Sequence, residues 1–219
     1  MTDGFVFDMD GVLFDTERLC QRCSSVVAKT YGIGDIIDNL YQQAIGLNRA
    51  SEKKLFEQVV GRTFPYDEYR DKCSRQIKQV IAEEGIPVKA GAYMLLQYLK
   101  TNRYKIALAT STSKESAMSH LEMSKMTEYF NVIITGDMVE KGKPDPEIYL
   151  KACKGLEIVP QNAVAIEDSP NGLKSAAAAG LRTIMVEDMI PYTPSLEPYA
   201  SMNLKSLTDV LELLRKGEL

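Results

Sequence analysis

Along this chain, strand-like runs alternate with helical patterns, and the spacing of these elements constrains the fold more than any other feature. Five short apolar runs, each ending in polar residues, are typical of buried strands: residues 5–7, 105–109, 132–135, 163–166 and 183–186. Helical patterns lie between them, at residues 92–100, 114–123, 146–154 and 169–179. Near-continuous apolar strands suit a sheet covered on both faces. The alternation therefore predicts an α/β fold, a doubly wound parallel sheet with right-handed crossovers.

One interval in this series is too long for a single crossover. Thr110 and Gly136 are 26 residues apart and Gly136 and Asp168 are 32 apart, which fits strand–helix–strand units of roughly 30 residues. Asp8 and Thr110 are 102 apart, and the sequence between them shows helical patterns at residues 16–31, 35–44, 49–60 and 66–84. We therefore expect an α/β core domain of residues 1–15 plus 86–219, interrupted by a helical cap domain of residues 16–85.

The C-terminal part has a different composition. Residues 189–202 contain three prolines and are typical of a surface loop. A helical pattern follows at residues 204–215. The sequence thus predicts five strands, a long loop and a final helix.

Charge and composition exclude several classes of function. The net charge is −4 without a basic block, which disfavours nucleic acid or an anionic membrane as a partner. The single histidine, His120, excludes a site with several histidine ligands. Four scattered cysteines do not form a disulfide scaffold, and no run of residues is apolar and long enough to cross a membrane. The start of the chain shows no signal-peptide pattern, so we expect a cytoplasmic protein.

Polar residues with a shared chemical character follow the predicted strands. In an open parallel sheet, ligands bind at the carboxyl ends of the strands. The candidate residues at these ends are Asp8, Asp10, Thr110, Ser111, Lys143, Glu167 and Asp168. Converging carboxylates repel one another unless a cation holds them, and their hard oxygen atoms favour Mg²⁺. Hydroxyl groups and a lysine beside them suit a phosphate group.

The first two of these residues are two positions apart, so on an extended segment their side chains point the same way. A carboxylate can attack phosphorus and form an aspartyl phosphate. A second carboxylate beside it can carry the proton of the leaving group. Asp8 and Asp10 are thus candidates for a nucleophile and a general acid/base in phosphoryl transfer.

These motifs together resemble the haloacid-dehalogenase superfamily. The matching segments are Asp8-Met9-Asp10-Gly11-Val12, Thr110-Ser111, Lys143-Pro144 and Glu167-Asp168-Ser169, in that order and each at a strand end or helix start. The resemblance covers essentially the whole chain, including the helical insertion. It implies a Rossmann-like core with a cap domain and a Mg²⁺-dependent hydrolase acting on phosphate esters.

The resemblance also implies a role for each residue. Asp8 is similar to the nucleophile and Asp10 to the general acid/base. The implied metal ligands are Asp8, the backbone carbonyl of Asp10, Asp168 and, through a water molecule, Glu167. The implied phosphate-binding residues are Thr110, Ser111 and Lys143, with Arg49 of the cap contacting a distal phosphate.

Within the superfamily, the chain is most similar to the β-phosphoglucomutase-like and pseudouridine-5′-phosphatase-like branch. Shared stretches include Asp15-Thr16-Glu17, residues 142–146 and Asp168-Ser169-Pro170-Asn171-Gly172. The cap segment Gly46-Leu47-Asn48-Arg49 resembles the one that carries the phosphate-contacting arginine. One position departs from the mutases: they have a histidine near the start of the first cap helix, where this chain has Cys20. That departure favours hydrolysis over isomerisation.

We therefore expect a phosphatase that cleaves a small phosphorylated metabolite, a sugar phosphate or a nucleoside monophosphate, and acts as a monomer. A hexose-phosphate mutase of the β-phosphoglucomutase type is the alternative within the same class. A phospho-aspartate receiver module is an alternative of another class, because receivers also combine Asp, Mg²⁺, Thr and Lys at strand ends. The 102-residue interval counts against it, since such modules have no helical insertion.

Overall fold

The apolar run that opens the chain is the central strand of a parallel sheet. The computed structural model describes residues 2–45 and 49–219. The strands found there are β1 (Gly4–Phe7), β2 (Lys105–Ala109), β3 (Val132–Ile134), β4 (Ala163–Glu167), β5 (Arg182–Val186) and β6 (Met202–Leu204). They form one sheet in the order β3-β2-β1-β4-β5-β6, with every neighbouring pair parallel. The predicted doubly wound parallel sheet is confirmed.

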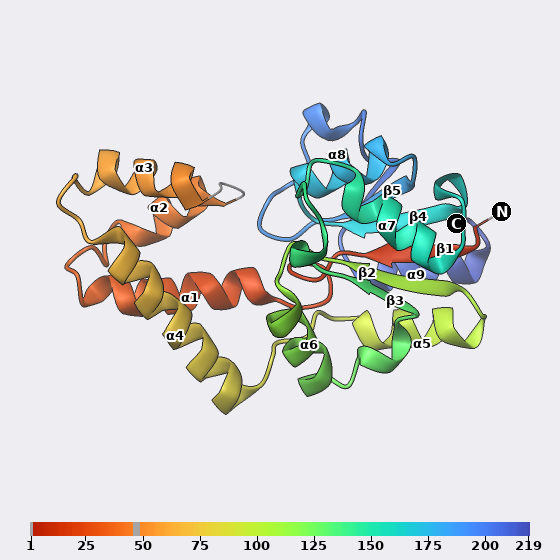
Figure 1. Ribbon diagram of the computed structural model, residues 1–219, viewed down its shortest axis with the longest axis horizontal. Helices are drawn as coiled ribbons and strands as arrows, with labels where there is room; N and C mark the ends of the chain where they lie inside the picture. The colour runs from red at the N-terminus through yellow and green to blue at the C-terminus, as the bar shows by residue number, and fades with distance from the viewer. Residues whose placement is uncertain (1, 46–48) are drawn as a thin grey trace. The chain divides into compact units, whose positions relative to one another are not determined.

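Helices cover both faces of this sheet, which is why its central strands are apolar along their whole length (Figure 1). The helices of this part are α5 (Ala92–Thr101), α6 (Lys114–Met123), α7 (Glu147–Leu156), α8 (Pro170–Ala178) and α9 (Leu207–Lys216). Helices α7 and α8 pack against β1 to β5 on one face, and α5 and α9 pack together on the other. Loops between strands and helices therefore meet at the carboxyl edge of the sheet.

The sixth strand corrects the prediction for the C-terminal part. Residues 189–202 were expected to form a loop and residues 204–215 a helix. Instead Met202 and Leu204 pair with Ile184 and Val186 of β5, and the helix begins at Leu207. A three-residue strand at the edge of a sheet is too short to show a periodic pattern. The helix begins where Ser206 accepts a hydrogen bond from the Asp209 N–H, an ordinary N-cap.

The chain divides into two compact units. The α/β unit contains the described residues up to Asp15 together with Val88–Leu219, and the helical unit is Thr16–Pro87. The helical unit consists of α1 (Thr16–Lys29), α2 (Ile37–Ala44), α3 (Arg49–Val59) and α4 (Tyr66–Glu84). Its own core is rich in aromatic rings, with Phe56 stacked on Phe64 and in contact with Tyr66 and Tyr69. We propose that this unit is the cap domain.

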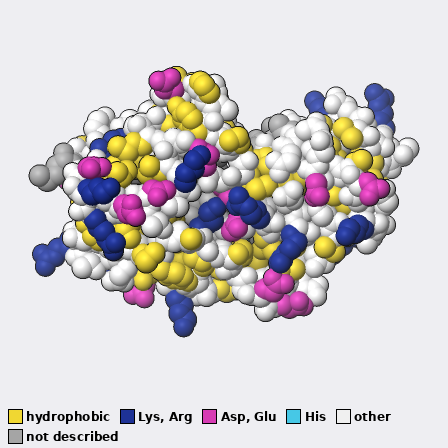
Figure 2. Space-filling view, turned by 180° about the vertical axis from the view of Figure 1, so that it is seen from behind, with side chains coloured by type: hydrophobic (Ala, Val, Ile, Leu, Met, Phe, Trp, Pro, Cys, Tyr) yellow, Lys and Arg dark blue, Asp and Glu magenta, His cyan; other side chains and the backbone are white. Residues whose placement is uncertain are grey.

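The surface carries charges of both signs. Figure 2 shows acidic and basic side chains interspersed among apolar ones on the face in view, as expected for a net charge of only −4. Among the helices of the described residues, none combines the length and the apolar character that a membrane span requires.

Candidate active site

Four of the predicted residues lie at the carboxyl edge of the sheet, in the α/β unit. Asp8 follows β1, and its backbone N–H donates to the Ile166 carbonyl of the neighbouring strand β4. Glu167 is the last residue of β4 and Asp168 follows it. Because β1 and β4 are adjacent and parallel, Asp8 lies beside Glu167 and Asp168 although 159 and 160 positions separate them in the sequence.

Lys143 joins two of these carboxylates. Its Nζ donates to Asp8 Oδ1 at 2.6 Å and to Glu167 Oε1 at 2.5 Å. The side chains of Lys143 and Glu167 are 6% and 0% exposed, so the ion pairs lie almost entirely out of water. The loop before α7 carries this lysine, and the side chain reaches back across the sheet edge. The sequence motifs of the first, third and fourth segments are therefore in direct contact.

Glu167 is the most heavily hydrogen-bonded of these groups. Its Oε1 accepts from Lys143 and from the Tyr149 hydroxyl at 2.7 Å. Its Oε2 accepts from the N–H groups of Asp168 and Ser169 and from the Ser169 hydroxyl. Five donors surround this one carboxylate. Glu167 is thus held as an internal partner of Lys143, and this arrangement favours contact with a metal ion through water over direct coordination.

The electrostatic balance of the cluster is negative, because one ammonium serves two buried carboxylates. Burial raises the pKa of Asp8 from 3.8 to about 8; Lys143 opposes this rise, and Glu167 and Asp10 add to it. Burial alone would lower the pKa of Lys143, but Asp8 and Glu167 outweigh it and the pKa is raised. A second cation beside Asp8 would offset the cost of burying its charge and the repulsion from Glu167 and Asp10, and would therefore favour the ionised carboxylate.

Three acidic residues bring their carboxylate oxygens close together where such a cation would bind. Asp8, Glu167 and Asp168 each have a carboxylate oxygen within 4.8 Å of the other two. An all-oxygen set with excess negative charge fits Mg²⁺, which keeps several water ligands and binds few carboxylates. Gly11 allows this close approach: its φ is +80°, and a Cβ there would overlap the Asp168 carboxylate.

Asp10 has a different environment from Asp8. Its Oδ2 accepts a hydrogen bond from the Thr112 hydroxyl at 2.6 Å. Thr112 was not among the predicted site residues, although it follows two of them directly. Thr110 is buried, and its hydroxyl accepts from the Thr112 N–H, while Ser111 is exposed. The turn after β2 thus holds three small hydroxyl residues in three different environments.

Arg49 belongs to the helical unit and is described there by itself. It is the first residue of α3, and its guanidinium donates to Asp67 at 3.1 Å. The side chain is 65% exposed. The rest of the segment that suggested phosphate contact, residues 46–48, lies outside the described residues. Its role in binding stays a prediction.

Two residues that contact these groups, Tyr149 and Thr112, were not predicted from the sequence. Tyr149 is fully buried on α7, and Lys143 Nζ lies 5.2 Å from the centre of its ring. Thr112 fixes the Asp10 carboxylate, as described above. The spacing of Tyr149 from Pro144 offers a weak signal, since a residue on the first turn of α7 can face the loop that precedes the helix.

Comparison with known proteins gives a consistent result. The family model described as haloacid dehalogenase-like hydrolase matches residues 5–186. A phosphorylated carbohydrates phosphatase of Thermotoga maritima is 33% identical over 182 residues, 83% of each chain. A Drosophila melanogaster protein inferred to be a pseudouridine-5′-phosphatase is 30% identical, over 84% of this chain and 80% of its own. The solved structure of a proposed β-phosphoglucomutase from Thermotoga maritima has a TM-score of 0.83 at 30% identity, covering 98% of this chain and 99% of its own.

Proposed function

The chain belongs to the haloacid dehalogenase-like hydrolase family and is a phosphoric monoester hydrolase; within that class, we propose that it is a Mg²⁺-dependent phosphatase that forms an aspartyl phosphate on Asp8. The observation that carries this proposal is the buried bridge from Lys143 to Asp8 and Glu167. The bridge holds the Asp8 carboxylate beside the Lys143 ammonium at the carboxyl edge of the sheet, which supports Asp8 as the nucleophile.

Asp8 is the nucleophile of the first step. Its carboxylate oxygen attacks phosphorus while the bond from phosphorus to the leaving oxygen breaks. Asp10 gives its proton to the leaving oxygen, and the Thr112 hydroxyl holds the Asp10 carboxyl in place for this transfer. In the second step Asp10 takes a proton from water, the oxygen of that water attacks phosphorus, and the bond to Asp8 breaks. Inorganic phosphate leaves, and both aspartates return to their first state.

The remaining residues bind charge. Lys143 neutralises an oxygen of the transferred phosphoryl group, and Thr110 and Ser111 supply hydroxyl and N–H donors from the turn after β2. Asp8, Asp168 and the backbone carbonyl of Asp10 would hold Mg²⁺, with Glu167 contributing through water. When bound, the ion supplies the positive charge that lets the nucleophile and a phosphate dianion approach each other.

The names of two relatives support a substrate class. The names of the two curated relatives refer to phosphorylated carbohydrates and to a nucleoside monophosphate. We propose that this chain hydrolyses a sugar phosphate or a nucleoside monophosphate. Cys20, half-buried in α1, stands where the mutases have histidine, which supports hydrolysis over isomerisation. The helical unit is proposed to select the leaving group.

A screen of phosphate release tests the proposal. The purified protein is incubated with sugar phosphates, nucleoside monophosphates and phosphoglycolate, with Mg²⁺ and with a chelator. We expect stoichiometric phosphate from at least one sugar phosphate or nucleoside monophosphate, only with Mg²⁺. Formation of an isomeric sugar phosphate without free phosphate would favour a mutase. Turnover that a chelator leaves unchanged would contradict the proposed metal dependence.

A further inference from the structure

The loop between β3 and α7 carries Lys143, and the position of this loop decides where its ammonium lies. A lysine has a flexible stem of four methylene groups, so a fixed ammonium requires a fixed backbone. Residues 139–146 have no regular helix or strand to hold them. Something else must set the distance between this backbone and Asp8.

We propose that Glu147 is a positioning residue for Lys143: its carboxylate clamps the loop from outside the site. This inference rests on the proposed function, because Lys143 is the group through which Glu147 would act. Glu147 is the first residue of α7, four positions after Lys143. It is not a member of the carboxylate group that surrounds Lys143.

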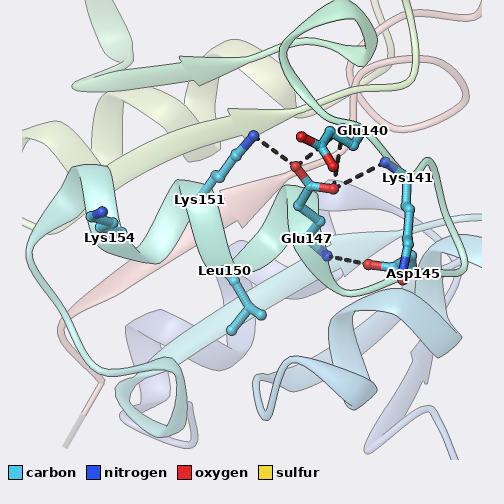
Figure 3. Close-up of a pocket in the computed structure, with 7 residues that line it drawn as sticks. All are labelled: Glu140, Lys141, Asp145, Glu147, Leu150, Lys151 and Lys154. Atoms are coloured by element: carbon cyan, nitrogen blue, oxygen red, sulfur yellow. Dashed lines mark hydrogen bonds and ion pairs between the residues drawn. The ribbon is translucent and has the colours of Figure 1, made fainter.

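The contacts of Glu147 hold the loop backbone on both sides of Lys143. Its carboxylate accepts the backbone N–H of Glu140 at 3.1 Å and that of Lys141 at 2.9 Å. Its own N–H donates to Asp145 Oδ1 at 3.1 Å. Figure 3 shows this arrangement, with the side chain of Glu147 directed at the backbone of the two preceding loop residues. The loop is therefore tied to the start of α7 before and after Lys143.

Two further residues fix the same loop. Lys151, one turn along α7, donates to Glu147 Oε1 at 2.7 Å and to the Met138 carbonyl at 2.7 Å. The Ser175 hydroxyl of α8 donates to the Asp145 carbonyl at 2.6 Å. Lys151 joins the start of the loop to α7, and Ser175 joins the end of the loop to α8. Glu147 is the acceptor shared by the ammonium and the two loop N–H groups.

The charge of Glu147 is secure at any pH at which the protein would be assayed. Hydrogen bonds from Lys151 and from the Lys141 and Glu140 N–H groups lower its pKa from 4.5 to about 2. A carboxylate at the first turn of a helix also interacts favourably with the helix dipole. If Glu147 had a purely structural role, its contacts would affect only the stability of the protein. If it positions Lys143, loss of its carboxylate must also change phosphate binding and turnover through Lys143.

Three variants separate these roles. Glu147→Ala removes every acceptor, whereas Glu147→Gln keeps an amide oxygen for the loop N–H groups. Glu128→Ala is the matched control, because Glu128 also pairs with a lysine in the α/β unit, at 3.0 Å from Lys100. We expect Glu147→Ala to lower kcat/KM roughly tenfold, since small displacements of a positioned group cost about one to two powers of ten. Glu147→Gln recovers part of this loss, and Glu128→Ala leaves kcat/KM unchanged.

Binding of inorganic phosphate in the presence of Mg²⁺ gives the decisive measurement. We expect Glu147→Ala to weaken phosphate binding in the otherwise unchanged protein but not on a Lys143→Ala background, because the two residues act through one group. Equal weakening on both backgrounds would overturn the inference. So would a fall in melting temperature with kcat/KM and phosphate affinity unchanged in both Glu147 variants.

The outcomes also separate this inference from the proposed function. If Asp8→Asn and Lys143→Ala both keep full activity, the proposed function fails. If these two variants are inactive while Glu147→Ala and Glu147→Gln match the unchanged protein, only the positioning role fails.

Discussion

Lys143 of the α/β unit and Lys53 of the helical unit each form an ion pair of 2.6 Å with an aspartate, but the two aspartates differ in pKa. Lys53 and Arg49 share Asp67, whose side chain is 56% exposed, and their hydrogen bonds lower its pKa. Lys143 pairs with Asp8, and burial raises the pKa of Asp8 to about 8 despite the lysine. The distance between the charges is the same, so the difference comes chiefly from the loss of water around Asp8, to which the charges of Glu167 and Asp10 add.

This comparison shows what an ion pair contributes in each setting. Exposed pairs contribute about 0 to 1 kcal/mol, because water screens both charges. For a buried pair, loss of one partner costs about 3 to 5 kcal/mol, because an uncompensated charge is left behind. A buried cluster with more negative than positive charge adds little to the stability of the fold, because removing the charges from water offsets their mutual attraction. Its presence is better explained by phosphate chemistry than by folding.

The largest expected effect is that of Asp8→Asn. The amide keeps the shape of the side chain but is not a nucleophile, so turnover should fall by roughly a thousandfold or more. Phosphate release per folded protein is the measurement. Asp67→Asn, the same change in the exposed pair, should leave turnover unchanged. Near-normal activity of the Asp8 variant would show that Asp8 is not the nucleophile, and turnover would then depend on neither aspartate.

Lys143→Ala comes next. Loss of one positioned charge should lower kcat by about a hundredfold. In the metal-free protein it should also lower the free energy of unfolding by about 3 kcal/mol, because Asp8 and Glu167 lose their shared partner. Chemical denaturation measures the second effect. Lys53→Ala should change the free energy of unfolding by less than about 1 kcal/mol. Equal losses of unfolding free energy in the two lysine variants would show that burial does not make the Lys143 ion pairs matter more for stability than the Lys53 pair.

The pH dependence of stability should separate the two aspartates in sign. A folded-state pKa of about 8 for Asp8, against 3.8 when exposed, means that the folded protein binds more protons than the unfolded chain between these values. Stability of the metal-free protein from this group therefore falls as pH rises through that window. Asp67 has a lowered pKa, so its contribution is lost only as pH falls below the ordinary range.

Mg²⁺ should oppose the loss of stability that ionisation of Asp8 causes at high pH. Cation binding displaces the proton, so the rise in melting temperature on adding Mg²⁺ should be larger at about pH 9 than at about pH 6. At a free Mg²⁺ concentration a hundredfold above Kd, the free energy of unfolding should rise by about 2.7 kcal/mol. Thermal scans with Mg²⁺ and with a chelator at both pH values measure it. A rise that is larger at the lower pH would contradict the raised pKa of Asp8.

The sequence was sufficient for those parts of the site that depend on strand ends. Asp8, Glu167 and Asp168 follow apolar runs, and parallel strands bring their carboxyl ends together, so their proximity could be expected. Lys143 was expected at a strand end with them, but it lies in the loop before α7, where a lysine has no periodic signal. The fold class followed from the alternation of elements, and the family model confirms the family to which the motifs pointed.

Other features depend on geometry that no local pattern encodes. Thr110, Ser111 and Thr112 have the same chemistry within one turn, and only the backbone path decides that Thr112 reaches Asp10. Tyr149 is an apolar position of α7 by pattern, and its hydroxyl finds Glu167 only after α7 packs on the sheet. Strand β6 exists because a neighbouring edge was available to three residues.

The smallest expected effect is that of Arg49→Ala. The free energy of unfolding should change by less than about 1 kcal/mol, since the arginine is exposed and Lys53 still pairs with Asp67. If Arg49 contacts a distal part of the substrate, KM should rise about threefold with kcat unchanged, which is the signature of lost uniform binding. Lys53→Ala is the matched control, because it removes the other partner of the same carboxylate and should leave KM unchanged. An equal rise of KM in both variants would trace the effect to Asp67 and the local structure of α3. An unchanged KM in Arg49→Ala would leave Arg49 as a surface ion pair and Lys143 as the basic residue on which phosphate binding depends.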